Sequence, residues 1–159
     1  MISVQFNGDK KVIKSIENLG SRSHRRELFD QIGSYGVSST QQRFLDQTGP
    51  DGQKWKPSAR ARENGGQTLR DRNHLFQSLT HDYSADHAEW GTNIIYAAIH
   101  QFGGIIKAKS ANALQFFVGN RFATVKQVVM PARPFLGIDS KDEAEIAAIV
   151  DDWVRETVQ

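Results

Sequence analysis

The pattern of apolar and polar residues predicts a strand and a helix at the start of the chain. Apolar residues alternate with polar ones over residues 2–6, which is typical of a half-buried strand, and Asn7-Gly8 then favours a turn. Apolar residues next recur at helical spacing over residues 12–19, and Gly20 follows as a helix stop. We therefore expect a short strand followed by a short helix.

A longer helix is predicted from Ser23 to Gln47. Its apolar and small residues share one stripe of a helical wheel: Phe29, Gly33, Gly36, Thr40 and Phe44. A glycine inside a helix costs roughly 1 kcal/mol relative to alanine, but a stripe of small residues lets another segment approach closely. The alternative is a helix that breaks between the two glycines.

Residues 48–66 form the least regular stretch of the sequence, because they are rich in Gly, Pro and charged residues. We expect a flexible basic loop here. Trp55 is its one large apolar side chain, and we expect the indole ring to attach the loop to the body of the protein.

A central segment that ends in two glycines is expected to form a short buried helix. Ile95, Ile99 and Phe102 lie at positions i, i+4 and i+7, which predicts one apolar face. Tyr96 and His100 lie four residues apart on a neighbouring face. The glycine pair suits a helix C-cap, because glycine adopts a positive φ without a Cβ clash.

Strands are predicted on both sides of this central helix. Before it, a helical or turn segment precedes two strands; after it, an exposed loop precedes two strands that pair with each other. The predicted ranges are Leu69–Leu79 for the turn segment, Leu79–Tyr83 and His87–Gly91 for the first two strands, 104–112 for the loop, and Leu114–Val118 and Val125–Met130 for the last two strands.

A rigid connector and a final helix complete the pattern. Pro131 and Pro134 fix φ and remove two backbone donors, so the chain leaves the sheet here, and Phe135-Leu136 re-enter the core. Ser140 and Glu143 match a capping box for the last helix. Its apolar stripe consists of Ile146, Ile149, Val150 and Trp153. Together the elements predict an α+β fold: an antiparallel sheet of about four strands flanked by N- and C-terminal helices, with a short central helix.

Composition assigns this pattern to one domain spanning residues 1–159. Apolar residues make up 38% and charged residues 24% of the chain, and there is no cysteine, so disulfide and thiolate chemistry are excluded. No apolar run approaches the roughly 20 residues that a membrane span requires. The stretch at residues 2–6 is too short and too polar for the apolar region of a signal peptide. We expect a soluble protein with no membrane partner.

Charge is distributed unevenly, although the net value is only +2. Residues 1–72 hold 13 Lys/Arg against 8 Asp/Glu, whereas residues 139–159 hold 2 against 7. This asymmetry permits head-to-tail contact between copies of the chain, in which the acidic last helix meets a basic surface from the first half of a neighbouring copy. It also permits contact with nucleic acid, to which the basic residues of region 54–72 beside Trp55 would contribute. Solvated helix faces explain the same asymmetry without any partner.

The sequence contains no recognised catalytic or cofactor-binding pattern. None of the five histidines belongs to HExxH or to another metal-binding motif, and GxSxG, P-loop and GxGxxG patterns do not occur. His81 and His87 could meet across a hairpin and bind a metal, and His100 beside Tyr96 could act as an acid or base. A structural role for these histidines is the simpler interpretation. We therefore expect no enzymatic activity, cofactor or metal site.

Three motifs resemble a known family. YAAIHQFGG at residues 96–104 resembles the YAxIHQFGG signature of the virion-morphogenesis, or tail-completion, family of tailed phages and Mu-like prophages. PARPFLG at residues 131–137 resembles that family's second motif, and Gly52, Trp55 and Pro57 are similar to its G-x-x-W-x-P loop. Together the similarities cover the chain from about residue 25 onward.

The sequence departs from the family pattern at one turn. Leu69, Leu75 and Ser78 match the pattern around this turn, but Arg72-Asn73 stand where the family usually has Thr-Gly. Asn tolerates the left-handed conformation nearly as well as Gly, so we expect the turn to be retained.

The resemblance implies a non-enzymatic assembly protein that completes the tail or joins head and tail at the neck. Its partners would be other phage tail or neck proteins and further copies of itself in a ring, within the virion and, during assembly, in the host cytoplasm. The candidate structural and interface residues are Trp55, Tyr96, His100, Gln101, Phe102, Gly103, Gly104, Pro131, Arg133, Pro134 and Phe135. We expect Arg133 to bind carbonyls left open at the end of the central helix. The alternative is a nucleic-acid-binding module at residues 54–72.

Overall fold

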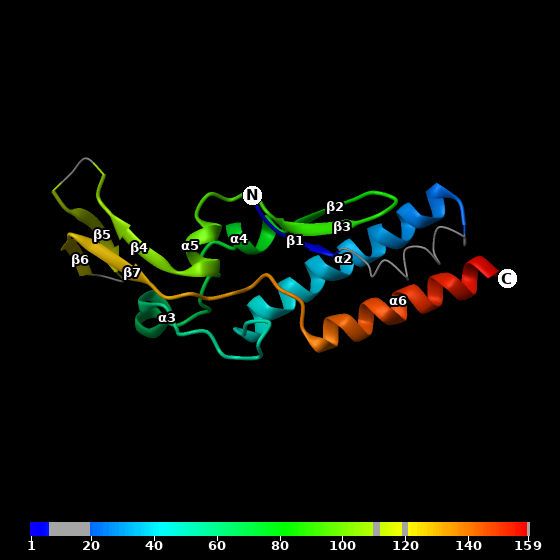
Figure 1. Cartoon of the computed structure of the whole chain (residues 1–159). Helices are drawn as coiled ribbons and strands as arrows, with labels where there is room; N and C mark the ends of the chain where they lie inside the picture. The colour runs from blue at the N-terminus through cyan, green and yellow to red at the C-terminus, as the bar shows by residue number, and fades with distance from the viewer. Residues whose placement is uncertain (7–19, 110–111, 119–120, 159) are drawn as a thin grey trace.

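Helices and antiparallel strands together form an elongated molecule, which confirms the predicted α+β class (Figure 1). A computed structural model describes residues 1–6, 20–109, 112–118 and 121–158. Two long helices lie side by side at one end of the molecule, and paired strands extend from the other end (Figure 1). The helix predicted over residues 12–19 lies outside the described residues.

The described part of the chain contains five helices and seven strands. The helices are α2 (Arg22–Asp46), α3 (Ala59–Asn64), α4 (His74–Gln77), α5 (Ala97–Phe102) and α6 (Ser140–Val158). The strands are β1 (Ile2–Phe6), β2 (Thr80–Tyr83), β3 (Ala88–Thr92), β4 (Gly104–Lys107), β5 (Leu114–Val118), β6 (Arg121–Val125) and β7 (Gln127–Met130). None of the described helices combines the length and the apolar character needed to cross a bilayer.

The predicted long helix is continuous, and its two glycines lie against the sheet formed by β1, β3 and β2. A Cβ added at Gly33 would lie 2.6 Å from the His81 ring, and one added at Gly36 would overlap the Trp90 ring. Because these glycines have no side chain, α2 can approach β2 and β3 closely and bury Trp90 between them. The alternative of a helix that breaks at the glycines is therefore wrong.

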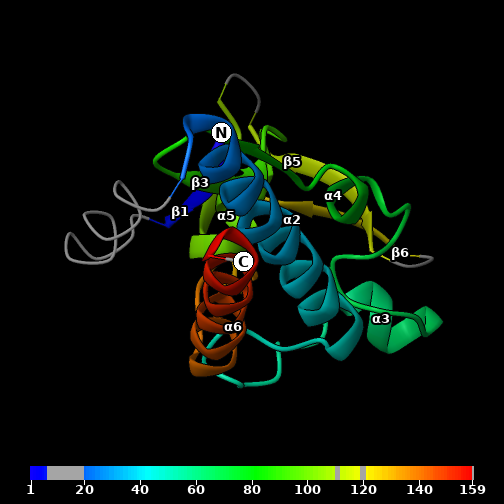
Figure 2. The ribbon, with the colours of Figure 1, turned by 90° about the vertical axis from the view of Figure 1, so that its right-hand side faces the viewer.

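The last helix packs antiparallel along α2, as Figures 1 and 2 show from two directions. Leu28, Phe29 and Ile32 of α2 form one buried apolar cluster with Ile146 and Trp153 of α6. The indole nitrogen of Trp153 also donates to the His24 carbonyl at 3.1 Å. The predicted apolar stripe of the last helix is thus confirmed.

The capping box of α6 lies one residue earlier than the predicted Ser140/Glu143 pair. The Asp139 carboxylate accepts from the backbone N–H groups of Lys141 and Asp142, both at 2.9 Å. In return, the Asp142 carboxylate accepts from the Asp139 N–H at 3.0 Å. Two acidic residues can form the same reciprocal box as Ser and Glu, and Asp142 is the one that the core buries.

Strand pairing after the central helix differs from the prediction. The strands expected in one sheet of about four are divided, within the described residues, among three small sheets ordered β1-β3-β2, β4-β7 and β5-β6. Residues 104–107, expected in a loop, form β4 and pair with β7. β5 pairs with β6, so of the predicted strand Val125–Met130 only Val125 pairs with β5, opposite Leu114. A partner close in sequence closes a shorter loop at a lower entropic cost, which explains why β6 takes this place.

Candidate functional site

The three family-like motifs meet along the connector, residues 131–137, which crosses the middle of the molecule without regular structure (Figure 1). The Arg133 N–H donates to the His100 carbonyl at 2.7 Å. The indole nitrogen of Trp55 donates to the Pro134 carbonyl at 2.8 Å. The central helix and the tryptophan loop therefore both hold the backbone of the connector, and we call this set of contacts the junction.

Gln101 makes the most extensive contact of the junction. Its side-chain oxygen accepts from the N–H groups of Phe135 and Leu136, both at 3.0 Å. Its side-chain nitrogen donates to the Leu136 carbonyl at 2.9 Å. An amide side chain can accept and donate at once. A single Gln therefore pairs with the backbone N–H and C=O groups of the connector, as a neighbouring strand would. Its 9% exposure means that water cannot replace these bonds.

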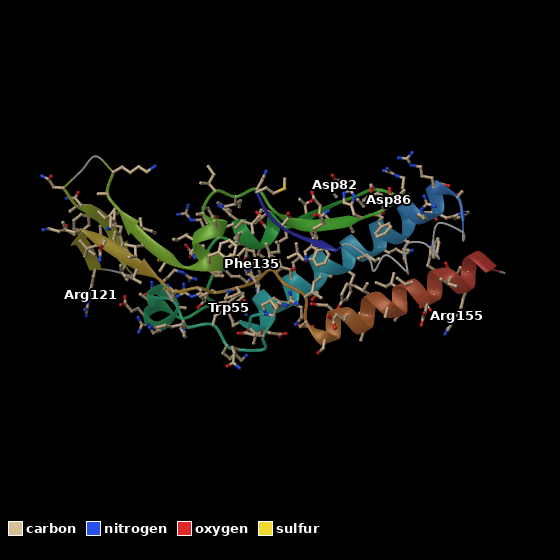
Figure 3. The ribbon with its side chains drawn as sticks, in the orientation of Figure 1. Trp55, Asp82, Asp86, Arg121, Phe135 and Arg155 are labelled. Carbon is tan, nitrogen blue, oxygen red and sulfur yellow. The ribbon has the colours of Figure 1, made fainter. Side chains whose placement is uncertain are left out.

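Aromatic rings fill the space beneath the junction, where Figure 3 labels Trp55 and Phe135 close together. Phe135 is fully buried and lies 5.2 Å from the ring of Phe44. Trp55 meets Phe44 edge-on at 5.4 Å. The predictions that Trp55 attaches its loop to the body and that Phe135-Leu136 re-enter the core are confirmed.

Residues 48–66 are more regular than the sequence indicates, because they include α3 and its N-cap. The Ser58 hydroxyl accepts from the Ala61 N–H at 3.1 Å, and Thr48 forms an isolated bridge with Lys54. The flexibility of residues 48–66 stays a prediction.

Asn73, in the turn that precedes α4, has φ 58°. The left-handed conformation expected at this position is therefore confirmed.

Arg133 binds differently from the prediction. Its backbone N–H, and not its guanidinium group, reaches the carbonyl at the end of α5. The Nε of Arg133 donates instead to the Lys56 carbonyl at 2.7 Å, in the tryptophan loop. The reason is proximity: Gly103 lacks a Cβ and allows the connector backbone to approach α5, since an added Cβ would lie 2.7 Å from the Ala132 nitrogen.

Burial controls the electrostatics of the junction. Desolvation lowers the pKa of His100 below 6.5, and the nearby Arg133 guanidinium lowers it further. Desolvation also lowers the pKa of Arg133. Tyr96 meets His100 edge-on at 6.0 Å, as the spacing predicted, and the His100 Nδ1 has no hydrogen-bond partner among the described residues. A neutral histidine is the form that suits this site.

The central helix does not bury the apolar face that its spacing predicts. Ile95 is 98% and Phe102 72% exposed, whereas Ala97 and Gln101 are buried. The helix begins only at Ala97, so Ile95 lies before it and helical spacing does not apply there. α5 packs against the connector through the Ala97 and Gln101 positions. Ile99, the third residue of the predicted face, is half-buried, and Phe102 faces outward.

The glycine pair after α5 has the conformation that the sequence predicts. Gly103, the C-cap residue, has φ 69°, and Gly104 has φ 147°. Both values favour glycine over residues with a Cβ. The pair leads the chain from α5 directly into β4, so it fixes the direction in which the following strands leave the body.

An ion pair that the sequence analysis did not identify joins the connector to both long helices. The buried guanidinium group of Arg43 contacts the buried carboxylate of Asp142 and donates to the Gly137 carbonyl at 2.8 Å. Tyr35 donates to the Asp142 carboxylate at 3.0 Å, and burial together with this bond raises the pKa of Tyr35 to about 12. The sequence feature that could have predicted this ion pair is the position of Arg43 beside Phe44, on the inner side of the helix.

A half-open cleft of about 370 Å³ lies beside the junction. Its polar lining includes the cations Arg60, Arg72 and Arg133, the carboxylate of Asp71, and the histidines His74 and His100. The two other histidines considered for a metal are engaged elsewhere: His81 contacts Asp30 at 2.7 Å, and His87 contacts Ser84 at 2.8 Å. In the part of the chain that the structure describes, no three potential ligand side chains gather in the way a metal ion requires.

Comparison with known proteins gives consistent matches. The model of the phage virion morphogenesis family matches residues 7–155. Mu-like prophage FluMu G protein 2 of Haemophilus influenzae is 30% identical over 156 residues, which cover 98% of this chain and 97% of that protein. The protein named "Putative capsid assembly protein G" of Escherichia phage Mu is 31% identical over 146 residues, covering 86% of this chain and 84% of that protein. No solved structure matches the chain significantly.

Proposed function

Because the chain belongs to the phage virion morphogenesis family, we propose that it is a non-enzymatic structural protein that completes the tail or joins head and tail at the neck. It acts as a single domain through contacts with other tail or neck proteins and with copies of itself. It works in the host cytoplasm during assembly and remains in the virion. The capsid-assembly name of the phage Mu relative supports a role in building the particle.

One observation carries this proposal: the end of α5 and the two residues before this helix display apolar side chains. Ile95, Tyr96 and Phe102 are 98%, 46% and 72% exposed, while the opposite side of the same segment is fixed to the connector. Exposed apolar side chains on a rigid support are typical of interaction sites. The junction therefore acts as a support, and the outward side of α5 is the contact surface.

Charge distribution adds a mechanism for contact between copies. The acidic last helix of one copy would meet a basic surface of a neighbour, forming a heterologous contact that can close into a ring. Asp142 of that helix is used internally by Arg43. Glu143, Glu145 and Asp151 are exposed, and the exposed Asp152 lies 3.7 Å from Arg155 of the same helix. Complementary charge favours the correct orientation and a fast encounter.

Complementation of a phage from which this gene has been deleted tests the proposal. We expect the deletion to give heads and tails that are not joined, or incomplete tails, in electron micrographs. The double variant Ile95→Ser/Phe102→Ser should fold normally and fail to restore complete particles, whereas Leu45→Ser, at an exposed apolar position of α2, should restore them. Complete particles from the deletion strain would refute the proposed function.

The alternative function is nucleic-acid binding through residues 54–72, and exposed Lys56, Arg62 and Arg72 favour it. Other cations of this region are engaged within the protein: Lys54 donates to the Asp46 carbonyl at 2.7 Å, and Arg60 forms an ion pair with Asp71 at 3.5 Å. Binding to phosphates would weaken steeply as salt rises. A DNA titration at two salt concentrations tests it, and no binding at low salt excludes it.

A further inference from the structure

The strands after α5 form an arm that extends away from the body (Figure 1). We define the arm as β4, β5, β6 and β7, the described part of residues 104–130. Large apolar side chains are exposed along it: Ile105 (56%), Phe117 (72%), Phe122 (57%) and Val129 (67%). Phe117 and Phe122 lie opposite each other in the β5–β6 register, with ring centroids 5.2 Å apart.

Such an arm needs a partner to cover it. A two-stranded ladder is marginally stable in water unless a further layer packs against it. Phe116 and Val118, on one face of β5, are half-buried, whereas Phe117 and Phe122, on the other face of the β5–β6 pair, are exposed. The exposed rings therefore indicate a docking surface.

The charge of the arm indicates the chemistry of that partner. Residues 104–130 contain four basic residues and no acidic residue. All four are exposed: Lys107, Lys109, Arg121 and Lys126. A partner must therefore present acidic groups around a surface on which aromatic rings can lie.

The outer face of α6 meets both requirements. Its inner stripe packs on α2, whereas its exposed acidic residues are Glu143, Glu145, Asp151, Asp152 and Glu156. They outnumber the two exposed basic residues of the helix, Lys141 and Arg155, of which Arg155 lies 3.7 Å from Asp152. Between them lie the exposed small side chains of Ala144, Ala147 and Ala148. Alanines give the phenylalanine rings a flat apolar surface, and the surrounding carboxylates can pair with the basic residues of the arm.

The arm and the outer face of α6 cannot meet within one molecule. Figure 3 shows Arg121 of the arm at one end of the molecule and Arg155 of α6 at the other. We propose that the arm of one copy lies on the outer face of α6 of the next copy. This head-to-tail contact rests on the proposed function and identifies its homotypic interface. Because the two surfaces differ, the contact can repeat from copy to copy.

Charge reversal in both surfaces tests this pairing. Light scattering or native mass spectrometry across concentration should show that the wild-type protein self-associates. Reversing the arm with Lys107→Glu/Lys126→Glu, or the helix with Glu145→Lys/Asp152→Lys, should each raise the Kd of self-association about tenfold or more. A chain that carries both reversals should regain association. The matched control Lys56→Glu/Arg62→Glu, with two exposed cations outside the arm, should associate as the wild type does.

Directed cross-linking provides a second measurement, because the chain contains no cysteine. A mixture of Phe117→Cys and Ala148→Cys proteins should form a cross-linked dimer with a short thiol-specific reagent. A mixture of Phe117→Cys with Gln31→Cys, an exposed position of α2, should not.

Three outcomes overturn the inference. Wild-type association that both charge reversals leave unchanged means that copies meet through another surface. A wild-type protein that stays monomeric at all concentrations means that the arm has another partner. Arm-dependent binding of DNA, lost in Lys107→Glu/Lys126→Glu, means that the partner is nucleic acid. The deletion experiment is independent of all three, so the proposed function can hold where this inference fails.

Discussion

At the scale of single residues, the Gln101 side chain forms hydrogen bonds with the connector backbone that a neighbouring strand would otherwise form. Its amide group binds three backbone groups of Phe135 and Leu136, which lie outside any sheet. Buried backbone groups need partners, because an unpaired one costs about 1–3 kcal/mol. The side chain therefore allows a buried connector to exist without regular secondary structure.

Replacing this side chain should destabilise the protein strongly. In Gln101→Ala the buried N–H groups of Phe135 and Leu136 lose their acceptor, and we expect a loss of about 3 kcal/mol in the free energy of unfolding. Urea unfolding followed by circular dichroism measures it. Gln77→Ala, at an exposed position of α4, is the control and should change stability by less than about 0.5 kcal/mol. Equal stability of the two variants would contradict the role given to Gln101.

His100 should make stability depend on pH. Its pKa in the folded protein lies below the ordinary value of 6.5, first because the ring is desolvated and second because Arg133 is near. Between the two pKa values the unfolded chain therefore binds more protons than the folded protein. The contribution of the neutral His100 to stability is fully present above about pH 6.5 and falls as pH decreases through that range. The urea midpoint at pH 7.5 and pH 5.5 should differ less in His100→Gln than in the wild type. Identical differences would show that His100 does not contribute.

At the scale of elements, α2 packs closely on the β1-β3-β2 sheet because glycines on the contacting side of the helix have no side chain. Gly33 and Gly36 face His81 and Trp90 and leave no room for a Cβ. The usual penalty of glycine in a helix is offset by the burial of Trp90, which is only 2% exposed. A sequence feature that weakens the isolated helix thus strengthens its packing.

Adding one methyl group at this contact should be destabilising. Ala at position 36 favours the helix by about 1 kcal/mol, but overlap with the Trp90 ring should cost more, typically 1–3 kcal/mol and at times beyond that. We expect Gly36→Ala to be less stable than the wild type in urea unfolding and to change the tryptophan fluorescence. Ser34→Ala, on the exposed side of the same helix, should be neutral or slightly stabilising. A stabilised Gly36→Ala protein would show that the contact can relax.

At the scale of the whole molecule, Arg43 and Asp142 connect parts that are far apart in sequence. Arg43 at the end of α2 reaches the connector at Gly137 and the start of α6 at Asp139 and Asp142. Although burial tends to raise the pKa of Asp139, its bonds with backbone N–H groups and Arg43 hold that pKa below its ordinary value. The pair thereby fixes where the last helix begins relative to the first long one.

Removing one member of this pair should affect the whole fold. In Asp142→Ala the buried Arg43 charge keeps only Asp139 as an ionic partner, so we expect a loss of about 3 kcal/mol. Thermal unfolding measures the loss. Glu27→Ala, an exposed acidic position on α2, should leave the melting temperature nearly unchanged. A small effect for Asp142→Ala would mean that water or Asp139 compensates for the lost carboxylate.

Local signals were sufficient for much of this architecture. Helical spacing identified α2 and α6, alternation identified β1, and two prolines marked the connector. β2 and β3 overlap the predicted strand ranges Leu79–Tyr83 and His87–Gly91. The glycine pair after α5 and Asn73 in its turn have the backbone conformations expected of them. Each of these features depends on residues within a few positions of one another, which is the information that a sequence pattern contains.

The sequence by itself determined the family, the α+β class and the type of most elements, because spacing, caps and turns are local properties. Only the tertiary structure decided that Ile95 and Phe102 face outward, that β4 pairs with β7, and that Arg43 meets Asp142. The physical reason is that burial and pairing depend on which distant segment covers a surface. Apolar spacing shows that a face needs cover, whereas the folded chain, or a partner, determines what covers it.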